Sequence, residues 1–317
     1  MPRFPILSLP FLARVEVARH LELKDLVQFA LIAKKSAAIA KGTNQSFGTV
    51  AVIFKPLKNY QLILNYCLDG SDLNCVVPSG NHETHGSDQM LTFPEVSQLE
   101  TIQKLMACVF KVFKAEYVYL TAYEPFDITM LLEPNFPVGA FIGLHLKRTS
   151  DDPKHSAQRI LFVLEELKPN SFGVQGEVED GFTYSQPVEN NIWLHGPRCW
   201  FDFEAAYNST CEKMSILVFD AYTNEQLNRL FKKWARGEGS LGYFEMYTSA
   251  SGEQEINKQM DEVLRGLGAT PWNADKELRT YRGYGWESDN GRNFLNNIGE
   301  ETQVFIEDHV FYFIFFQ

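Results

Sequence analysis

The sequence predicts a mixed α/β protein, α+β overall, in which a short helical module precedes a larger domain of helices and strands. Three observations support this prediction. Apolar residues recur at three- and four-residue spacing before Gly42, whereas amphipathic helical segments alternate with short strand-like runs beyond residue 48. Hydrophobic residues also make up 45% of the 317 positions, with 25 phenylalanines, which is the composition of a globular chain with a full core.

The predicted N-terminal module covers residues 1–42. Leu9 and Pro10 stand where a helix would begin, two further helical patterns follow, and Gly42 is a natural helix terminator. About forty residues of short helices bury little apolar surface by themselves. The module is therefore expected either to pack on the rest of the chain or to dock on a partner.

A polar bridge at residues 42–48 separates this module from the predicted second domain, residues 49–317. Strands are expected at 50–54, 60–64, 117–122, 141–146, 172–178, 214–219, 241–248 and 304–316, helices at 99–113, 155–167, 223–235 and 254–267, and a polar loop at 69–89. The helices start at unequal distances that exceed a standard solenoid period. An irregular leucine-rich-repeat-like stack is the first interpretation, and a compact mixed-sheet domain is the second.

Charge is unevenly distributed along the chain. The net charge is -11, yet residues 1–42 carry seven Lys and Arg against three Asp and Glu, which leaves 22 basic and 37 acidic groups elsewhere. This balance disfavours a nucleic-acid or anionic-membrane binder, and no apolar run reaches the roughly 18 to 20 residues that span a bilayer. A basic head on an acidic body suggests two modules with different partners, although solvated helix faces would give the same charges.

Cysteine usage indicates a reducing compartment. The five cysteines are an odd number and form no Cys-x-x-Cys pair, so a disulfide framework and a zinc ribbon are both poorly supported. The cytoplasm or the nucleus is the expected location.

No catalytic residue, cofactor or metal site is predicted. The sequence lacks a nucleophile elbow, a P-loop and a kinase signature. Gly237, Gly239 and Gly242 spell Gly-x-Gly-x-x-Gly but follow a helix instead of opening one, so they are interpreted as a helix end. His82 and His85 lie in a Ser/Gly-rich segment with no third ligand nearby, which favours a surface loop over a metal site.

One hexapeptide has the composition of an interaction site. Tyr281, Arg282, Tyr284 and Trp286 are separated by glycines, and such aromatic and Arg side chains can stack on a ligand or form a binding hot spot. The alternative is a glycine-turned loop on the core. This hexapeptide and the loop at 82–89 are the candidate substrate-binding segments.

The N-terminal segment resembles an F-box. That family's pattern opens with Leu-Pro and continues through apolar helical positions to a Leu-Asp-Pro-x-Asp-Leu turn. This chain matches it at Leu9, Pro10, Val17, Leu21, Glu22, Leu23, Asp25 and Leu26, and residues 32–35 match the start of the third helix. Three positions depart from the pattern, with Leu12 in place of Glu, Leu23 in place of Pro and Ser36 in place of Trp.

A second segment carries an independent resemblance. Residues 227–234, followed by Gly237, are similar to the core of the type-2 F-box-associated domain found in nematode F-box proteins. The similarity covers roughly residues 200–265. The two resemblances occur in the order that this family implies.

Together the resemblances imply the non-catalytic substrate-recognition subunit of an SCF-type E3 ubiquitin ligase. The F-box would dock on the Skp adaptor, which bridges to the cullin and RING subunits, and the second domain would bind a protein substrate for ubiquitination. Pro10 and Leu26 are expected to face the adaptor, within an adaptor-binding set of Leu9, Pro10, Leu12, Val17, Leu21, Leu23, Leu26 and Ile32. The adaptor family is acidic, so a basic module has the right sign to be steered to it.

Two other hypotheses stay open. The chain could be an F-box-like scaffold or a neutralising partner that acts outside a ligase. It could instead be an α/β enzyme, which predicts a deep pocket lined with convergent polar groups of shifted pKa.

Overall fold

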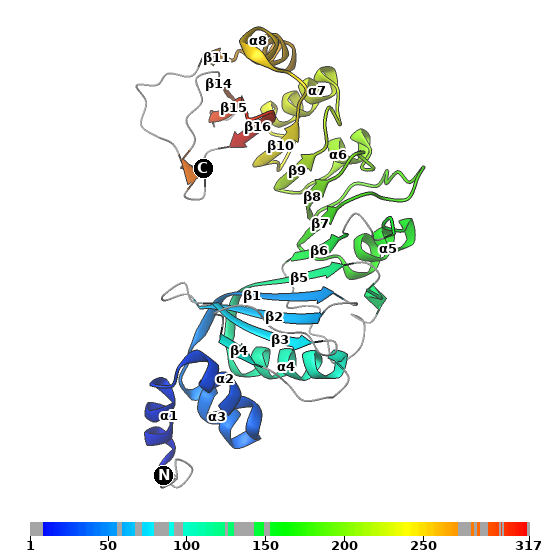
Figure 1. Ribbon diagram of the computed structural model, residues 1–317. Coiled ribbons are helices and arrows are strands. Elements are labelled where there is room, and N and C mark those ends of the chain that lie inside the picture. Colours follow the sequence, from blue (N-terminus) through cyan, green and yellow to red (C-terminus); the bar gives the residue numbers. More distant parts are fainter. Residues whose placement is uncertain are drawn as a thin grey trace. The chain divides into compact units, whose positions relative to one another are not determined.

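The computed structural model describes residues 9–55, 59–66, 72–78, 89–91, 98–123, 126–129, 143–148, 153–271, 280–281, 284–285, 291–297, 299 and 301–315. The chain forms two compact units, Met1–Pro153 and Lys154–Gln317 (Figure 1). Each unit combines helices with a sheet of parallel and antiparallel strands, which confirms the predicted α/β character. The unit boundary does not fall at residues 42–48, because the N-terminal helices belong to the first unit. The domain assignment 1–42 and 49–317 stays a prediction.

Three short helices open the first unit: α1 (Phe11–Arg19), α2 (Leu23–Ile32) and α3 (Lys34–Gly42). Small and branched apolar side chains fill the space between them, namely Val15, Ala18, Leu26, Val27, Ala30 and Ile39, all buried. Gly42 ends α3 against α1 so closely that a Cβ there would lie 2.8 Å from Val15 Cγ2. The expected helix terminator is therefore also a point of close helix–helix approach.

The sheet of the first unit has the strand order β6-β5-β1-β2-β3-β4. Its strands are β1 (Ser46–Lys55), β2 (Asn59–Tyr66), β3 (Asp72–Pro78), β4 (Gln89–Leu91), β5 (Lys114–Tyr123) and β6 (Gly143–Lys147). β1 pairs antiparallel with β2 and parallel with β5, which in turn runs parallel to β6. Helix α4 (Gln98–Val112) packs on β2 and β3 and also touches α2 and α3.

The second unit begins with a helical segment that changes its hydrogen-bond spacing. α5 (Ala157–Leu161) continues without a break into η4 (Phe162–Leu167), a π-helical stretch within the single helix predicted at 155–167. The stretch closes with the Lys168 N–H donating to the Val163 carbonyl at 2.9 Å. Lys168 itself adopts a left-handed conformation with φ 45°.

Four parallel strands follow, and their order in space is their order in the sequence. They are β7 (Ser171–Gln175), β8 (Asn191–His195), β9 (Lys213–Leu217) and β10 (Tyr243–Tyr247). Between them run α6 (Phe203–Asn208) and α7 (Asn224–Ala235), which lie on one side of the strands in Figure 1. Helix α8 (Gly252–Val263) follows β10 and packs against α7.

Helix α7 forms where the sequence predicts it because its ends and its apolar face are both encoded locally. Thr223 and Gln226 form a capping box at its N-terminus. Its buried side chains are Leu227, Leu230, Phe231 and Trp234. Phe231 stacks on Phe313 at 4.5 Å and meets Phe244 edge-on, so α7 covers the face of the sheet that these rings share. Gly237 ends the helix with φ 71°, as predicted for a helix end.

The sheet continues from β10 through β16 (Val310–Phe315), β15 (Glu301–Glu307), β14 (Arg292–Leu295) and β11 (Thr270–Pro271), all antiparallel. Two short strands, β12 (Thr280–Tyr281) and β13 (Tyr284–Gly285), pair with each other separately. The prediction of one strand at 304–316 was wrong. Asp308 and His309 both have positive φ (47° and 63°) and turn the chain into a hairpin.

Several other elements were not predicted, among them β3, β8 and α6. Residues 72–78 form β3 inside the segment 69–89 that was predicted as a polar loop, because they pair with β2 over seven positions. Strand β8 and helix α6 were missed between residues 178 and 214. Each is only five or six residues long, and their spacing makes the parallel strands more regular than the helices alone suggested.

Candidate interaction surfaces

The N-terminal helices leave large apolar side chains on their surface. Phe11 is 51% exposed, Leu12 76% and Ile32 75%, although each lies in a helix or at its end. Small domains rarely expose side chains of this size in one short segment without a binding role. Phe11 and Leu12 at the start of α1 and Ile32 at the end of α2 are candidate docking residues, and we call these three the N-terminal apolar surface.

The residues predicted to bind the adaptor divide into three groups. Pro10, Leu12 and Ile32 are exposed, and Leu9, Val17 and Leu21 are half-buried. Leu26 differs from the expectation that it faces a partner, because its side chain has 0% exposure and helps to hold the helices together. The side chain of Leu23 lies outside the described residues, and Phe11 was not among the predicted set.

Basic side chains accompany this surface. Lys34, Lys35 and Lys41 on α3 are exposed, as is Arg19 at the end of α1. Arg19 pairs with Glu16 at 2.6 Å, an exposed contact that adds little to stability. The Arg14 Nε donates to the Leu9 carbonyl at 2.5 Å, which fixes the chain as it enters α1. Exposed lysines leave the surface suited to an acidic partner.

The predicted hot spot at 281–286 is only partly described. Tyr281 and Tyr284 are backbone partners in the short pair β12–β13. Arg282 and Trp286 lie outside the described residues, as do residues 82–88 of the predicted loop 82–89, which include its two histidines. Whether these segments bind a substrate stays a prediction.

Strands β8 and β10 have one buried and one half-exposed face, whereas the three central residues of β7 and of β9 are buried on both faces. Along β8 and β10 buried and half-exposed residues alternate, as the period-two geometry of a strand requires. Phe244 and Met246 point to the side that α7 covers, and both are fully buried. The other side carries half-exposed Trp193, His195, Lys213, Tyr243, Glu245 and Tyr247. We call this second side the open face.

Polar contacts organise the centre of the open face. Glu245 accepts a hydrogen bond from the Tyr243 hydroxyl at 2.8 Å and another from the Ser215 hydroxyl on the neighbouring strand. The Lys213 ammonium lies 5.9 Å from the centre of the Tyr243 ring. The face therefore combines aromatic surface with a carboxylate whose direction is fixed. The sequence could not reveal it, because its residues come from separate strands.

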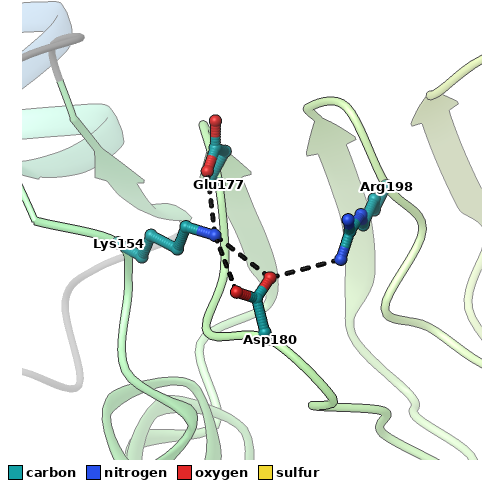
Figure 2. A network of polar contacts seen from close by, with 4 residues as sticks. All are labelled: Lys154, Glu177, Asp180 and Arg198. Carbon is teal, nitrogen blue, oxygen red and sulfur yellow. Dashed lines mark hydrogen bonds and ion pairs between the residues drawn. The ribbon is translucent and has the colours of Figure 1, made fainter.

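A polar pocket of about 380 Å³ lies beyond the carboxyl ends of β7 and β8. Figure 2 shows the Lys154 ammonium between Glu177 and Asp180, with Arg198 reaching Asp180 from the other side. The distances are 3.2 Å from Lys154 Nζ to Glu177 Oε2, 3.0 Å to Asp180 Oδ1, and 3.2 Å from Arg198 Nη1 to Asp180 Oδ1. Phe182 and Trp200, with ring centres 5.7 Å apart, form an aromatic wall.

The pocket's geometry rests on close backbone packing. The loop after β7 is tied to His155, just before α5, since the backbone N–H of His155 donates to the Glu177 carbonyl and the His155 carbonyl accepts from the Glu179 N–H, both at 2.9 Å. A Cβ at Gly196 would lie 2.6 Å from the Gly176 carbonyl oxygen, so glycine is required there. These contacts hold the charged side chains in place.

The electrostatics of this pocket favour an ion-pair clamp. The hydrogen bond from Lys154 lowers the pKa of Asp180, and the hydrogen bond to Asp180 raises the pKa of Lys154. Both pKa values move away from neutrality, whereas a general acid or base needs a pKa near the working pH. The charged groups are paired with one another, so we assign them to joining the two loops.

Two cysteines of the second unit, one of them in the wall of this pocket, are shielded. Burial raises the pKa of the Cys199 thiol, and burial raises the pKa of Cys211 to about 12. A reactive thiol requires a lowered pKa. Neither residue has the environment of a nucleophile.

Other features were searched for in the described part of the chain. No helix there is both long and apolar enough to cross a membrane. The same residues contain no cluster of three or more His, Cys, Asp or Glu side chains arranged to hold a metal ion. No protein-family model matches this chain, and comparison with curated proteins and with solved structures found no match.

Proposed function

We propose that this protein is the substrate-recognition subunit of an SCF-type E3 ubiquitin ligase, with the N-terminal helices as an F-box that docks on the Skp adaptor. The observation that carries the proposal is the exposure of Phe11, Leu12 and Ile32 on helices whose small core is otherwise closed. A few well-packed side chains near the centre of an interface contribute most of its binding free energy, so truncating them or giving them a charge weakens binding the most. The resemblance of residues 9–35 to the F-box pattern implies that the partner is a Skp adaptor.

The charge of the module supports the same partner. Exposed Lys34, Lys35 and Lys41 lie on α3, next to the helix that carries Ile32. An acidic adaptor would be attracted to such a surface, which raises the association rate. In this proposal Leu26 maintains the module's internal packing, while Leu12 and Ile32 contact the adaptor.

The second unit would hold the substrate. Its strands β7, β8 and β9 start at residues 171, 191 and 213, about 20 residues apart, within the range of leucine-rich repeats. Their parallel order and the helices on one side fit the proposed irregular repeat-like stack. Repeat stacks bind partners over extended surfaces, a property that suits a substrate receptor. The protein would act by proximity and would catalyse no step itself.

The proposal is tested by co-purification of the full-length chain with the adaptor. The double variant Leu12→Asp, Ile32→Asp should lose at least about nine-tenths of the adaptor, since a tenfold loss corresponds to only about 1.4 kcal/mol. Both side chains are more than 70% exposed, so the variant should still fold. Tyr117→Asp is the matched control, because Tyr117 on β5 is 50% exposed in the same unit and should leave binding unchanged.

Two outcomes would contradict the proposal. Unchanged recovery of the adaptor by the double variant would remove the N-terminal apolar surface from the interface. Recovery of the adaptor without any cullin would favour a scaffold that acts outside a ligase.

A further inference from the structure

A ribbon of four rings crosses the open face of the second unit. Trp193 and His195 lie 5.9 Å apart along β8, and His195 lies 6.1 Å from Tyr247 on β10, both pairs edge to face. Phe219, just beyond β9, stacks on Tyr247 with ring centres 5.1 Å apart. Phe219 is 61% exposed, so the ribbon ends in a large apolar surface open to solvent.

The strand register places carboxylate Glu245 on the same face as these rings. Trp193 pairs with Ser215, Ser215 with Glu245, and Glu245 with Tyr312. Paired residues on neighbouring strands point to the same side of a sheet. Tyr247 follows Glu245 by two positions and therefore shares its side.

The side of the ribbon nearest β16 is acidic. Burial raises the pKa of Tyr312 to about 12, and Glu245, Glu307 and Asp308 add to this rise, so all three carboxylates act on one phenol. Glu307 and Asp308 are exposed at the turn of the hairpin. Among the described residues no Lys or Arg forms an ion pair with any of these three carboxylates.

Aromatic faces and carboxylates select the same kind of ligand, and Lys213, the one described cation on the open face, lies at its far side beside the Tyr243 ring. A Lys ammonium or Arg guanidinium is attracted to the face of an aromatic ring, and more strongly where water is excluded. An acidic segment or a nucleic acid would be repelled by Glu245, Glu307 and Asp308. A purely apolar segment would bury Glu307 and Asp308 without a cationic partner, which is costly.

We infer that the open face binds an extended protein segment that carries Lys or Arg side chains, with the cation near Tyr247 and Glu307 and the backbone along the ribbon. The rings extend from β8 across β9 to β10, which is two spacings between neighbouring strands, or roughly 10 Å. An extended segment rises about 3.3 Å per residue, so about four residues would span that distance. Calling that segment a ubiquitination substrate rests on the proposed function. The binding of a basic segment does not.

The test uses the full-length protein and two fluorescent twelve-residue peptides of equal length, one with alternating Gly, Arg, Ser and Lys and one with Gly, Glu, Ser and Asp. Fluorescence anisotropy should show saturable binding of the basic peptide, weaker at higher salt, and none of the acidic peptide. Phe219→Ser and Glu307→Gln should each weaken the basic peptide by about fivefold or more. Both residues are exposed, so the variants should remain folded.

Matched controls separate the site from bulk charge. Glu238→Gln removes the same charge as Glu307→Gln, but Glu238 pairs with Arg236 at 2.8 Å away from the ribbon's residues. Tyr117→Ser removes an exposed aromatic residue from the other unit. Neither control should change the affinity for the basic peptide.

The outcomes distinguish this inference from the proposed function. Equal binding of the two peptides, absence of binding at millimolar concentration, or equal effects of test and control variants would overturn the inference. Binding of the basic peptide by a chain that never recovers the adaptor would support the inference and contradict the ligase role. Recovery of the adaptor without selective peptide binding would support the ligase role and contradict the inference.

Discussion

Phe231 joins helix α7 to the aromatic core of the second unit. It lies on α7 with 0% exposure and touches three rings of the sheet, with Phe311 at 5.9 Å and Phe313 at 4.5 Å in stacked geometry. Phe231→Ala should lower the free energy of unfolding by about 3 to 5 kcal/mol, because it removes buried surface and leaves a cavity. Urea denaturation followed by tryptophan fluorescence measures this.

A much smaller loss, below about 1 kcal/mol, would contradict the packing described here. Phe219→Ala is a useful comparison, since Phe219 is exposed and its removal should cost little stability.

His145 on β6 should make the first unit sensitive to mild acid. Burial lowers its pKa, and the nearby Lys147 lowers it further. The folded-state pKa is therefore below the unfolded value of about 6.5, and the unfolded chain binds the proton more readily. Stability should be fully present above about pH 6.5 and fall as the pH decreases through the folded-state pKa.

Thermal melts between pH 7.5 and 5 test this, with His145→Gln as the variant. The variant should lose less stability than the wild type over that range. Identical pH profiles for the two proteins would show that His145 is not buried in its neutral form.

The end of η4 shows how a backbone conformation sets a residue preference. Lys168 is exposed and adopts a left-handed conformation (φ 45°, ψ 54°) after the π-helical stretch. A side chain with a Cβ pays about 1 kcal/mol there, and glycine does not. Lys168→Gly should therefore raise the free energy of unfolding by up to about 1 kcal/mol, as measured by chemical denaturation.

The exposed Lys154 offers a control for the loss of a lysine charge, because Lys154→Gly breaks a described ion-pair network and has no left-handed residue to relieve. If Lys168→Gly destabilised the protein as much as Lys154→Gly, the strain account would be wrong.

Sequence patterns predicted the helices whose own residues mark where they begin and which side is apolar. Helix α7 has a capping box and an apolar stripe, and helix α4 has a continuous amphipathic pattern, so both fall within one or two residues of their predicted bounds. Strand β3 was read as a loop because polar residues surround its short apolar centre. Its identity depends on pairing with β2, which a local pattern does not contain.

The two candidate surfaces differ in how much of each could be predicted from the sequence. The N-terminal apolar surface was largely anticipated, since its residues are close in the chain, but the exposure of individual positions was not. Leu12 and Leu26 are the same residue type in similar helical patterns, yet Leu26 is buried and Leu12 is 76% exposed, because helix packing decides which side of each helix faces inward. The open face joins residues from position 193 to 247 on separate strands, so only strand order and register could bring them together.

Each unit of the whole molecule carries one candidate surface. The first exposes apolar residues among lysines, and the second exposes aromatic rings among carboxylates. The charge asymmetry of the sequence, basic in residues 1–42 and acidic beyond them, thus corresponds to two surfaces of opposite sign. Opposite signs would keep the two partners from competing, as complementary charge also works against wrong partners.

The central claim, that the N-terminal helices bind a Skp adaptor, is tested most directly with two purified proteins. The full-length chain and the adaptor should elute together from a size-exclusion column as one complex, whose mass by light scattering equals the sum of one copy of each. Separate elution of both proteins at micromolar concentration would contradict the claim.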